Sequence, residues 1–387
     1  MPPIGLLMAR NGMRNPMRTT LTIAGIAVGV IAFGFLQTVL AAYFIGVEAS
    51  SPNRLVTRHR VSLFNLLPIS QRKKILEIPG VTQVSYGVWF GGYYQDPQQF
   101  FGQVGVDPDY LKLYPEFILP DDQKKAYANE LQAAVVGRKL AKRFGWGLGD
   151  RVTLTSGIFS GTWDFIIRGI YHGRDRATDE TLMFFHWKRL DERLLTLGRG
   201  SQVGWYLVGV ENPRDNGRII SAIDAMFVNS SAPTLTETEK DFNLSFVSMM
   251  GTIITIIKIA SWIVIGIILL IMANTMMMSA RERIAEYGVM KTLGFRTVHL
   301  VALIAGEAVC VSLIGTVVGC LLNLGIISVV GRGIEETMGS MFPVFELTSL
   351  TIAYSAAMAL AAGLAACVVP IGRAVRVPIA DALRRID

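Results

Sequence analysis

The chain has 387 residues, of which 51% are hydrophobic and only 17% are charged. Soluble domains carry about 25% charged residues, so much of this sequence is suited to lipid rather than to water. The net charge of +7 could suggest a nucleic-acid partner, but the excess of basic residues lies beside the apolar runs, and the long polar stretch is nearly neutral. The charge therefore indicates membrane topology, and we expect no nucleic-acid partner.

Four charge-poor runs are long enough to cross a bilayer, whose core of about 30 Å takes roughly 20 helical residues. We predict transmembrane helices at 19–47, in a stalk and span at 246–280, at 297–331 and at 347–372. The stretch 48–245 has ordinary globular composition. The predicted fold is therefore a membrane α-helical protein with four transmembrane helices and a large extracytoplasmic α+β domain inserted between helices 1 and 2.

Charge placement predicts the orientation. The segments 1–18, 281–296 and 373–387 together carry eleven basic and four acidic residues, whereas the loop 332–346 has one basic residue against three acidic ones. Positive residues favour the cytoplasmic side of short loops. We expect an amphipathic cytoplasmic N-terminal segment, both termini inside and the large domain outside, in a multi-pass protein of the bacterial inner membrane. A cleaved signal peptide is disfavoured because the first apolar run exceeds the usual length of about 7–15 residues.

Strand-like and helix-like stretches alternate in the outer domain. The stretch VVGRKLAKRFG predicts a strand turning into a helix that stops at Gly145, and GDRVTLTS with TWDFIIRGIY predicts a hairpin. A helix is expected at 216–227. Another is expected from 235 to 258, running unbroken into the second span with Lys258 at the outer interface.

No motif for catalysis or metal binding is present in these 387 residues. There is no G-x-x-x-x-G-K-[ST] phosphate loop, no G-x-S-x-G nucleophile elbow and no metal-ligand spacing among the four histidines. The three cysteines, Cys310, Cys320 and Cys367, all fall within spans, so the outer domain must fold without disulfides. We expect a chain that is not an enzyme, with no catalytic residue, metal or bound cofactor.

The segment RERIAEYGVMKTLG, residues 281–294, is unusually long and charged for a link between two spans. It predicts a helix ended by Gly294 as a C′ glycine. Gly288 would cost about 1 kcal/mol relative to Ala in a helix, which suggests that another surface approaches closely there. The helix could contact a soluble partner, or it could simply turn the chain.

Several residues inside the spans also need an explanation. Glu307 is the only carboxylate in the third span, and an intramembrane acid is a functional candidate by default. It could relay protons, or it could form a structural hydrogen bond or ion pair with a neighbouring span. The pairs Gly25-x-x-x-Gly29 and Gly315-x-x-x-Gly319 would allow close helix packing, either within one subunit or at a dimer interface.

The 281–294 segment resembles the cytoplasmic coupling segment of MacB/FtsX-like ABC-transporter permeases, whose pattern is roughly E-R-x-x-E-x-G-x-x-K/R-x-x-G. The residues at those places are Glu282, Arg283, Glu286, Gly288, Lys291 and Gly294. The stretches ARNGMRNPMRTTLTIAGIAVGV, AVVGRKLAKRFGWGLGDRVTL and RAVRVPIADALRRID are similar to other parts of the family in the same order. The resemblance therefore covers nearly the whole chain.

The resemblance implies a permease subunit of a mechanotransmission-type ABC transporter. Some relatives carry a fused ATPase or ten spans, so we expect this chain to use a separate cytoplasmic ABC ATPase, acting as a dimer with ATP and Mg bound there. A second permease chain, identical or different, would complete the membrane part, and membrane lipids would surround it. The cargo would be lipid-, lipoprotein- or peptide-like, and a MacB-like machine would add a periplasmic adaptor and an outer-membrane channel.

Two other functions fit the same layout. An FtsX-like regulator would signal the state of the ATPase to an extracytoplasmic cell-wall hydrolase, although that branch usually has a smaller outer domain. A membrane-anchored binding domain would need no ATPase, and the resemblance of the 281–294 segment disfavours it.

Overall fold

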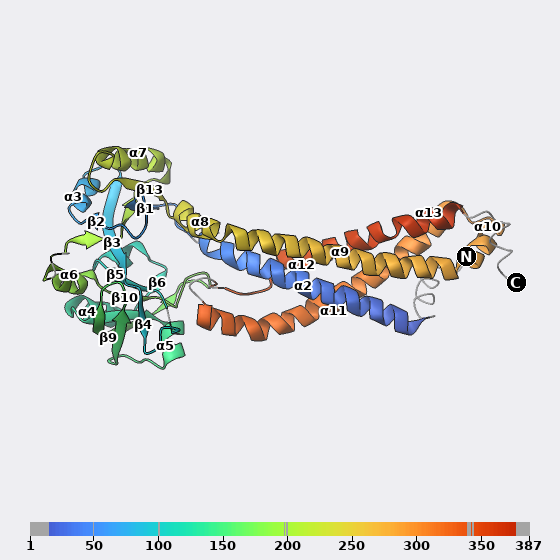
Figure 1. Cartoon of the computed structure of the whole chain (residues 1–387), viewed down its shortest axis with the longest axis horizontal. Helices are drawn as coiled ribbons and strands as arrows, with labels where there is room; N and C mark the ends of the chain where they lie inside the picture. Colours follow the sequence, from blue (N-terminus) through green and yellow to red (C-terminus); the bar gives the residue numbers. More distant parts are fainter. Residues whose placement is uncertain are drawn as a thin grey trace. The chain divides into compact units, whose positions relative to one another are not determined.

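A computed structural model describes residues 15–376 apart from 49, 100, 197, 199, 339–341 and 343. The chain divides into two compact units. The helix unit comprises Met1–Ala41, Gly251–Gly331 and Phe345–Asp387, and the outer unit comprises Ala42–Met250 and Arg332–Val344. Figure 1 labels most of the elements of both units.

Four helices in the described residues are long and apolar enough to span a membrane: Pro16–Ile45, Gly251–Glu282, Thr297–Glu335 and Ser349–Arg376. The individual helices are α2 (Pro16–Glu48), α9 (Gly251–Glu282), α10 (Ile284–Thr292), α11 (Thr297–Met338), α12 (Ser349–Ala366) and α13 (Val368–Arg376). The four spans exceed the roughly 20 residues that a bilayer core requires. The predicted fold class, four spans with a large mixed domain between the first two, is confirmed.

Glycines bring the spans into contact within one chain. A Cβ on Gly29 would lie 2.4 Å from the side chain of Ile268 on α9, and one on Gly315 would lie 2.7 Å from Ile26 on α2. Gly25 and Gly319 face Ile271 and Val30 in the same way. The missing side chains let α9 and α11 approach α2 closely. These contacts lie within one chain, which is one of the two alternatives that the sequence left open.

The outer unit is built on one large sheet with the strand order β13-β1-β12-β3-β5-β10-β7-β9-β8-β4, and β6 pairs with β9 beside this path. The long strands are β1 (Arg54–His59), β3 (Val81–Trp89), β5 (Gln103–Val106), β7 (Ala133–Gly137), β8 (Arg151–Ser156), β9 (Gly161–Gly173), β10 (Met183–His186), β12 (Trp205–Val210) and β13 (Thr234–Thr238). The short strands are β2 (Leu67–Pro68), β4 (Gly92–Tyr94), β6 (Phe117–Ile118) and β11 (Gln202–Val203), of which β2 and β11 pair with each other. Most neighbours are antiparallel, but β5 pairs with β10 and β7 with β9 in parallel.

Helices cover this sheet, and apolar side chains fill both of its faces. The helices are α3 (Gln71–Leu76), α4 (Asp121–Asn129), α5 (Arg138–Phe144), α6 (Trp187–Leu195), α7 (Asn216–Phe227) and α8 (Glu239–Met249), with 3-10 turns at Tyr110–Leu113 and Pro213–Asp215. Neighbouring residues of one strand belong to different buried clusters: Phe185 joins the larger cluster and Phe184 the smaller. Side chains along a strand alternate between the two faces of the sheet. The run MFFH of β10 therefore contributes apolar side chains to both faces.

Three predicted boundaries were wrong. The helix expected at 235–258 is the strand β13, then α8, then α9, because Thr238 starts α8 by accepting a hydrogen bond from the Asp241 N–H (3.1 Å). The loop expected at 332–346 begins later, since α11 continues to Met338. The helix expected at 281–294 is interrupted at Arg283, whose φ of −108° and ψ of 12° separate α9 from α10.

A buried histidine makes the outer unit sensitive to pH. His186 is 4% exposed, and its Nε2 donates to the Tyr127 carbonyl at 2.7 Å. Burial lowers the pKa of His186, against a smaller raising effect of that hydrogen bond. The unfolded chain binds this proton near pH 6.5, whereas the folded unit binds it only at lower pH. Stability from the neutral imidazole is therefore present above about pH 6.5 and is lost as the pH falls toward the folded pKa.

We expect the thermal midpoint of wild-type protein in mild detergent to fall more than that of His186→Gln when the pH is lowered from about 7.5 to about 5. The substitution keeps an N–H donor but removes the titrating group. Equal pH dependence of the two proteins would show that another group controls acid stability.

Candidate functional site

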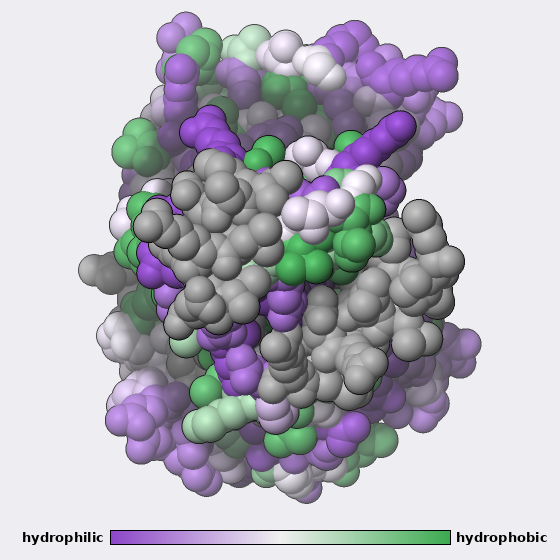
Figure 2. All heavy atoms as spheres, turned by 90° about the vertical axis from the view of Figure 1, so that its right-hand side faces the viewer, coloured by the Kyte–Doolittle hydropathy of each residue, from purple (hydrophilic) through white to green (hydrophobic). Residues whose placement is uncertain are grey.

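The candidate site is the turn between the second and third spans, at the end of the helix unit that carries α10. In Figure 2 this end presents hydrophilic residues next to an apolar patch. α9 ends at Glu282, and the nine-residue helix α10 follows from Ile284 to Thr292. Arg283 between them is not helical, so the axis of α10 need not continue that of α9.

A Schellman motif ends α10. The Phe295 N–H donates to the Met290 carbonyl at 3.0 Å, and the Gly294 N–H donates to the Lys291 carbonyl at 3.1 Å. Gly294 has φ = +85°, which any residue with a Cβ adopts only with strain. The structure therefore places Gly294 at the C′ position, and the chain leaves α10 at a fixed angle.

A buried ion pair fixes the start of α10 to the third span. Arg283 Nη1 donates to Glu307 Oε2 on α11 at 2.8 Å, and the two side chains are only 4% and 13% exposed. Ser279 of α9 also lies near, with its Oγ 3.5 Å from Glu307 Oε1. An ion pair to a neighbouring helix is one of the roles that the sequence left open for Glu307.

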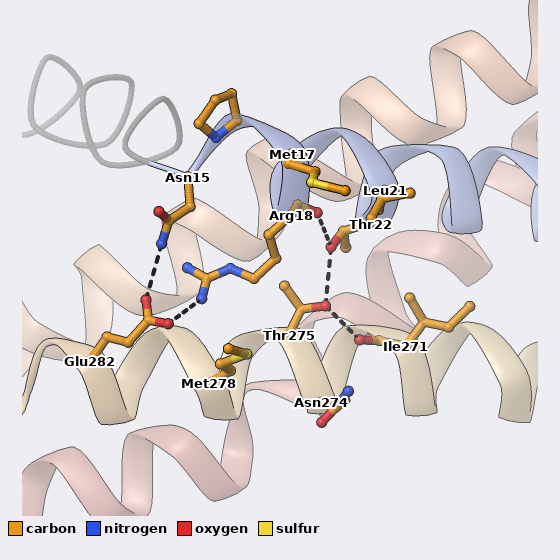
Figure 3. Close-up of a pocket in the computed structure, with 11 residues that line it drawn as sticks. Asn15, Met17, Arg18, Leu21, Thr22, Ile271, Asn274, Thr275, Met278 and Glu282 are labelled. Atoms are coloured by element: carbon orange, nitrogen blue, oxygen red, sulfur yellow. Dashed lines mark hydrogen bonds and ion pairs between the residues drawn. The ribbon is translucent and has the colours of Figure 1, made fainter.

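A second, more exposed pair joins the end of α9 to the start of α2. Arg18 Nη1 donates to Glu282 Oε1 at 2.8 Å, and Asn15 Nδ2 lies 3.3 Å from Glu282 Oε2. One turn further along, the hydroxyls of Thr22 and Thr275 are 3.1 Å apart. Figure 3 shows these contacts along a shallow groove between α2 and α9. The pair is partly solvated, so its contribution to stability is small.

Lys291 connects the other end of α10 to α13. Its Nζ donates to the carbonyls of Ala374 and Val375 at 3.1 and 3.0 Å. These carbonyls belong to the last turn of α13, where a cation is favoured by the helix dipole. Together with the two ion pairs, these bonds hold the turn at three places by residues that are far apart in the sequence.

The accessible side chains of α10 and of its C-cap residue Leu293 are mostly apolar. Val289 is 40% exposed and Leu293 is 71% exposed, and Thr292 between them is also exposed. The spacing i, i+3, i+4 places all three on one face of the helix. We call Val289, Thr292 and Leu293 the exposed face of α10.

Two family models match this sequence in the same order as its elements. Residues 19–226 match the MacB-like periplasmic core domain, and residues 258–379 match the FtsX-like permease C-terminal family. The chain belongs to the MacB/FtsX-like permease family. It is therefore a permease chain of this family.

A curated relative and several solved structures are similar to this permease. The macrolide export ATP-binding/permease protein MacB of Nitrobacter winogradskyi is 23% identical over 410 residues, which cover 96% of this chain and 58% of that protein. This permease thus spans 58% of the length of that relative. The periplasmic region of MacB from Actinobacillus actinomycetemcomitans is 12% identical with a TM-score of 0.37, covering 51% of this chain and 92% of that one. The extracellular domain of the transporter YknZ from Gram-positive bacteria is 12% identical with a TM-score of 0.36, covering 48% and 99%.

Most of the coupling residues predicted for this permease are used inside the chain. Glu282, Arg283 and Lys291 bind other helices, and Gly294 ends α10. Glu286 lies half-buried in the first turn of α10.

Gly288 is buried together with Tyr287. Burial raises the pKa of Tyr287 to about 12, which keeps its hydroxyl protonated at neutral pH. Gly288→Trp would consequently disturb the packing of α10 rather than test a partner contact. The exposed face was missed by the sequence reasoning, although the spacing of Val289 and Leu293 within a charged segment was a usable signal.

Proposed function

We propose that this permease couples ATP hydrolysis by a cytoplasmic ABC ATPase to movement of its outer unit, and that it exports or extracts a lipid-, lipoprotein- or peptide-like cargo. The observation that carries the proposal is the fixed attachment of α10. Its motif residues bind α2, α11 and α13, while its exposed face presents Val289 and Leu293 to a partner. Large contiguous apolar patches mark protein contacts, and we propose that these two side chains belong to such a contact.

Force on α10 would reach the spans through these contacts. The buried Arg283–Glu307 pair would carry movement to α11, and the bonds from Lys291 would carry it to α13. Helices joined in this way shift as rigid bodies between discrete packings, which is how small displacements at one site are amplified. The coupling residues Glu282, Arg283, Glu286, Gly288, Lys291 and Gly294 are therefore proposed to position α10, and the exposed face to meet the ATPase.

The proposal places α10 and both termini in the cytoplasm. The basic residues Arg281, Arg283, Lys291 and Arg296 gather around this turn, as the positive-inside rule requires. A separate ATPase subunit would act as a dimer and bind ATP and Mg, and a second permease chain would form the other half of the membrane part. A periplasmic adaptor and an outer-membrane channel would be added if the cargo leaves the envelope.

The experiment is to tag the C-terminus, purify the permease in mild detergent from native membranes, and identify what accompanies it. We expect an ABC ATPase in stoichiometric amount. Recovery of a cell-wall hydrolase together with that ATPase would favour the FtsX-like regulator over an exporter. If no ATPase is recovered even after crosslinking in the membrane, the anchored-domain alternative replaces this proposal.

A further inference from the structure

A buried arginine joins three separate segments of the outer unit. Arg54 is the first residue of β1, lies six residues beyond the end of α2, and is 5% exposed. Its Nε donates to Glu239 Oε2 at 2.8 Å, and its Nη2 donates to Glu116 Oε1 at 2.7 Å. Its Nη1 donates to the Leu113 carbonyl at 2.9 Å and to Glu116 Oε2 at 3.2 Å. The guanidinium carbon also lies 4.3 Å from the centre of the Tyr114 ring.

These segments include two of the places where the chain passes between the outer unit and the helix unit. Residues 50–54 follow α2, and Glu239 opens α8, which directly precedes α9. Glu239 Oε2 also accepts from the Ser51 N–H at 2.8 Å, and Asn243 Nδ2 donates to Ser50 Oγ at 2.9 Å. The two connections are therefore bonded to each other, and Arg54 bonds both to a third segment that ends in Glu116.

The charges of this cluster are matched by its surroundings. The side chains of Glu116 and Glu239 are 16% and 7% exposed, so two carboxylates share one guanidinium with little water. Glu239 lies in the first turn of α8, where the helix dipole and the Ser51 N–H also stabilise negative charge. Burial alone would lower the pKa of Arg54, but Glu116 and Glu239 reverse the effect and the pKa is raised. Arg54 therefore stays charged, and its planar guanidinium is held in one geometry by these bonds.

A neighbouring ion pair shows what is unusual about Arg54. Arg58, also on β1, binds Glu237 on β13 at 2.8 Å, with side-chain exposures of 16% and 18%. That pair only joins two strands that are already paired in the ladder. Arg54 also binds a residue at the end of that ladder, Glu239, which follows β13 directly. It differs from Arg58 because it binds in addition Glu116, which belongs to neither strand.

We propose that Arg54 is the positioning residue that makes α8, the segment after α2 and the sheet of the outer unit move as one body. This inference rests on the proposed function, because it concerns how movement of the spans would reach the sheet. Without Arg54, the loop before β1 and the first turn of α8 could pivot, and movement would be absorbed there. The planar guanidinium is required for this role because it binds both carboxylates at once, which the point charge of a lysine does not do.

The test uses spin labels at Met249→Cys on α8 and Lys188→Cys on α6, both exposed positions of the outer unit. The background lacks Cys310, Cys320 and Cys367, which lie outside that unit. The test variants are Arg54→Lys and the charge-free combination Arg54→Met with Glu116→Gln and Glu239→Gln. The matched control is Arg58→Met with Glu237→Gln.

We expect a narrow distribution of distances between the two labels in the parent protein and in the control. In both test variants the distribution should be about twofold wider, because the guanidinium that binds both carboxylates is lost. The charge-free variant should keep a thermal midpoint close to that of the parent, because removing a whole buried charge cluster is often neutral. This separates positioning from folding. Distributions as narrow as the parent's in both test variants would overturn the inference.

The same labels in the complex with the ATPase distinguish the inference from the proposed function. With nucleotide bound, the label distance of the parent should stay unchanged, since its outer unit moves as one body, whereas that of Arg54→Lys should shift. If no ATPase binds the parent while the widening persists, the proposed function fails and the role of Arg54 in joining the segments stands.

Discussion

Replacing Arg283 by Ala should destabilise the helix unit by about 3–5 kcal/mol, the usual cost of leaving one charge of a buried pair without its partner. The carboxylate of Glu307, whose side chain is 13% exposed, would stay on α11 without the guanidinium that binds it at 2.8 Å in the parent protein. We expect a large fall in the thermal midpoint in mild detergent and weaker association of the ATPase, because α10 would no longer be held at its start.

The double variant Arg283→Met with Glu307→Leu should recover most of that stability, since apolar residues of similar size replace the whole pair. A matched control is Arg18→Met, which breaks a pair whose side chains are 21% and 40% exposed and should cost no more than about 1 kcal/mol. If Arg283→Ala has the same thermal midpoint as the parent protein, the ion pair is not what holds α10 in place.

Replacing Leu293 by Glu should abolish stable association with the ATPase while leaving the permease folded. Leu293 is 71% exposed, so a charge there desolvates nothing within this chain. At the centre of a partner's apolar contact, the same charge should weaken binding at least about tenfold, which is about 1.4 kcal/mol or more. The measurement is the amount of ATPase recovered with the tagged permease, together with the thermal midpoint of each variant.

Phe64 supplies the control for this prediction. It is 81% exposed in the outer unit, so Phe64→Glu makes the same change to an accessible apolar residue on the opposite side of the membrane in the proposed topology. We expect it to leave ATPase recovery unchanged. Equal recovery with Leu293→Glu and with the parent would remove the exposed face of α10 from the contact.

Features set by local sequence were predicted well. The apolar runs predicted the four spans, and α7 begins and ends where its periodicity indicated, at Asn216 and Phe227. Gly145 ends α5 with φ = +70°, because a left-handed residue at a helix end favours glycine. The β8–β9 hairpin follows from two alternating stretches joined by a short turn.

Features set by contacts between distant residues could not be predicted. Glu282 and Arg18 are 264 residues apart, and Lys291 lies 83 residues from Ala374. A single sequence does not indicate which opposite charge folds against which, so the motif residues were expected at a partner's surface rather than inside the chain. The start of α8 was not predicted, because the Thr238 cap lies inside a stretch whose composition favours one long helix.

The most direct test of the central claim is a crosslink from Leu293→Cys in native membranes, using a permease tagged at its C-terminus. Phe64→Cys, labelled with the same reagent, serves as the control. We expect Leu293→Cys to become joined to an ABC ATPase and Phe64→Cys not to. Efficient labelling of Leu293→Cys with no ATPase in any crosslinked product would contradict the claim that the exposed face of α10 receives the force of ATP hydrolysis.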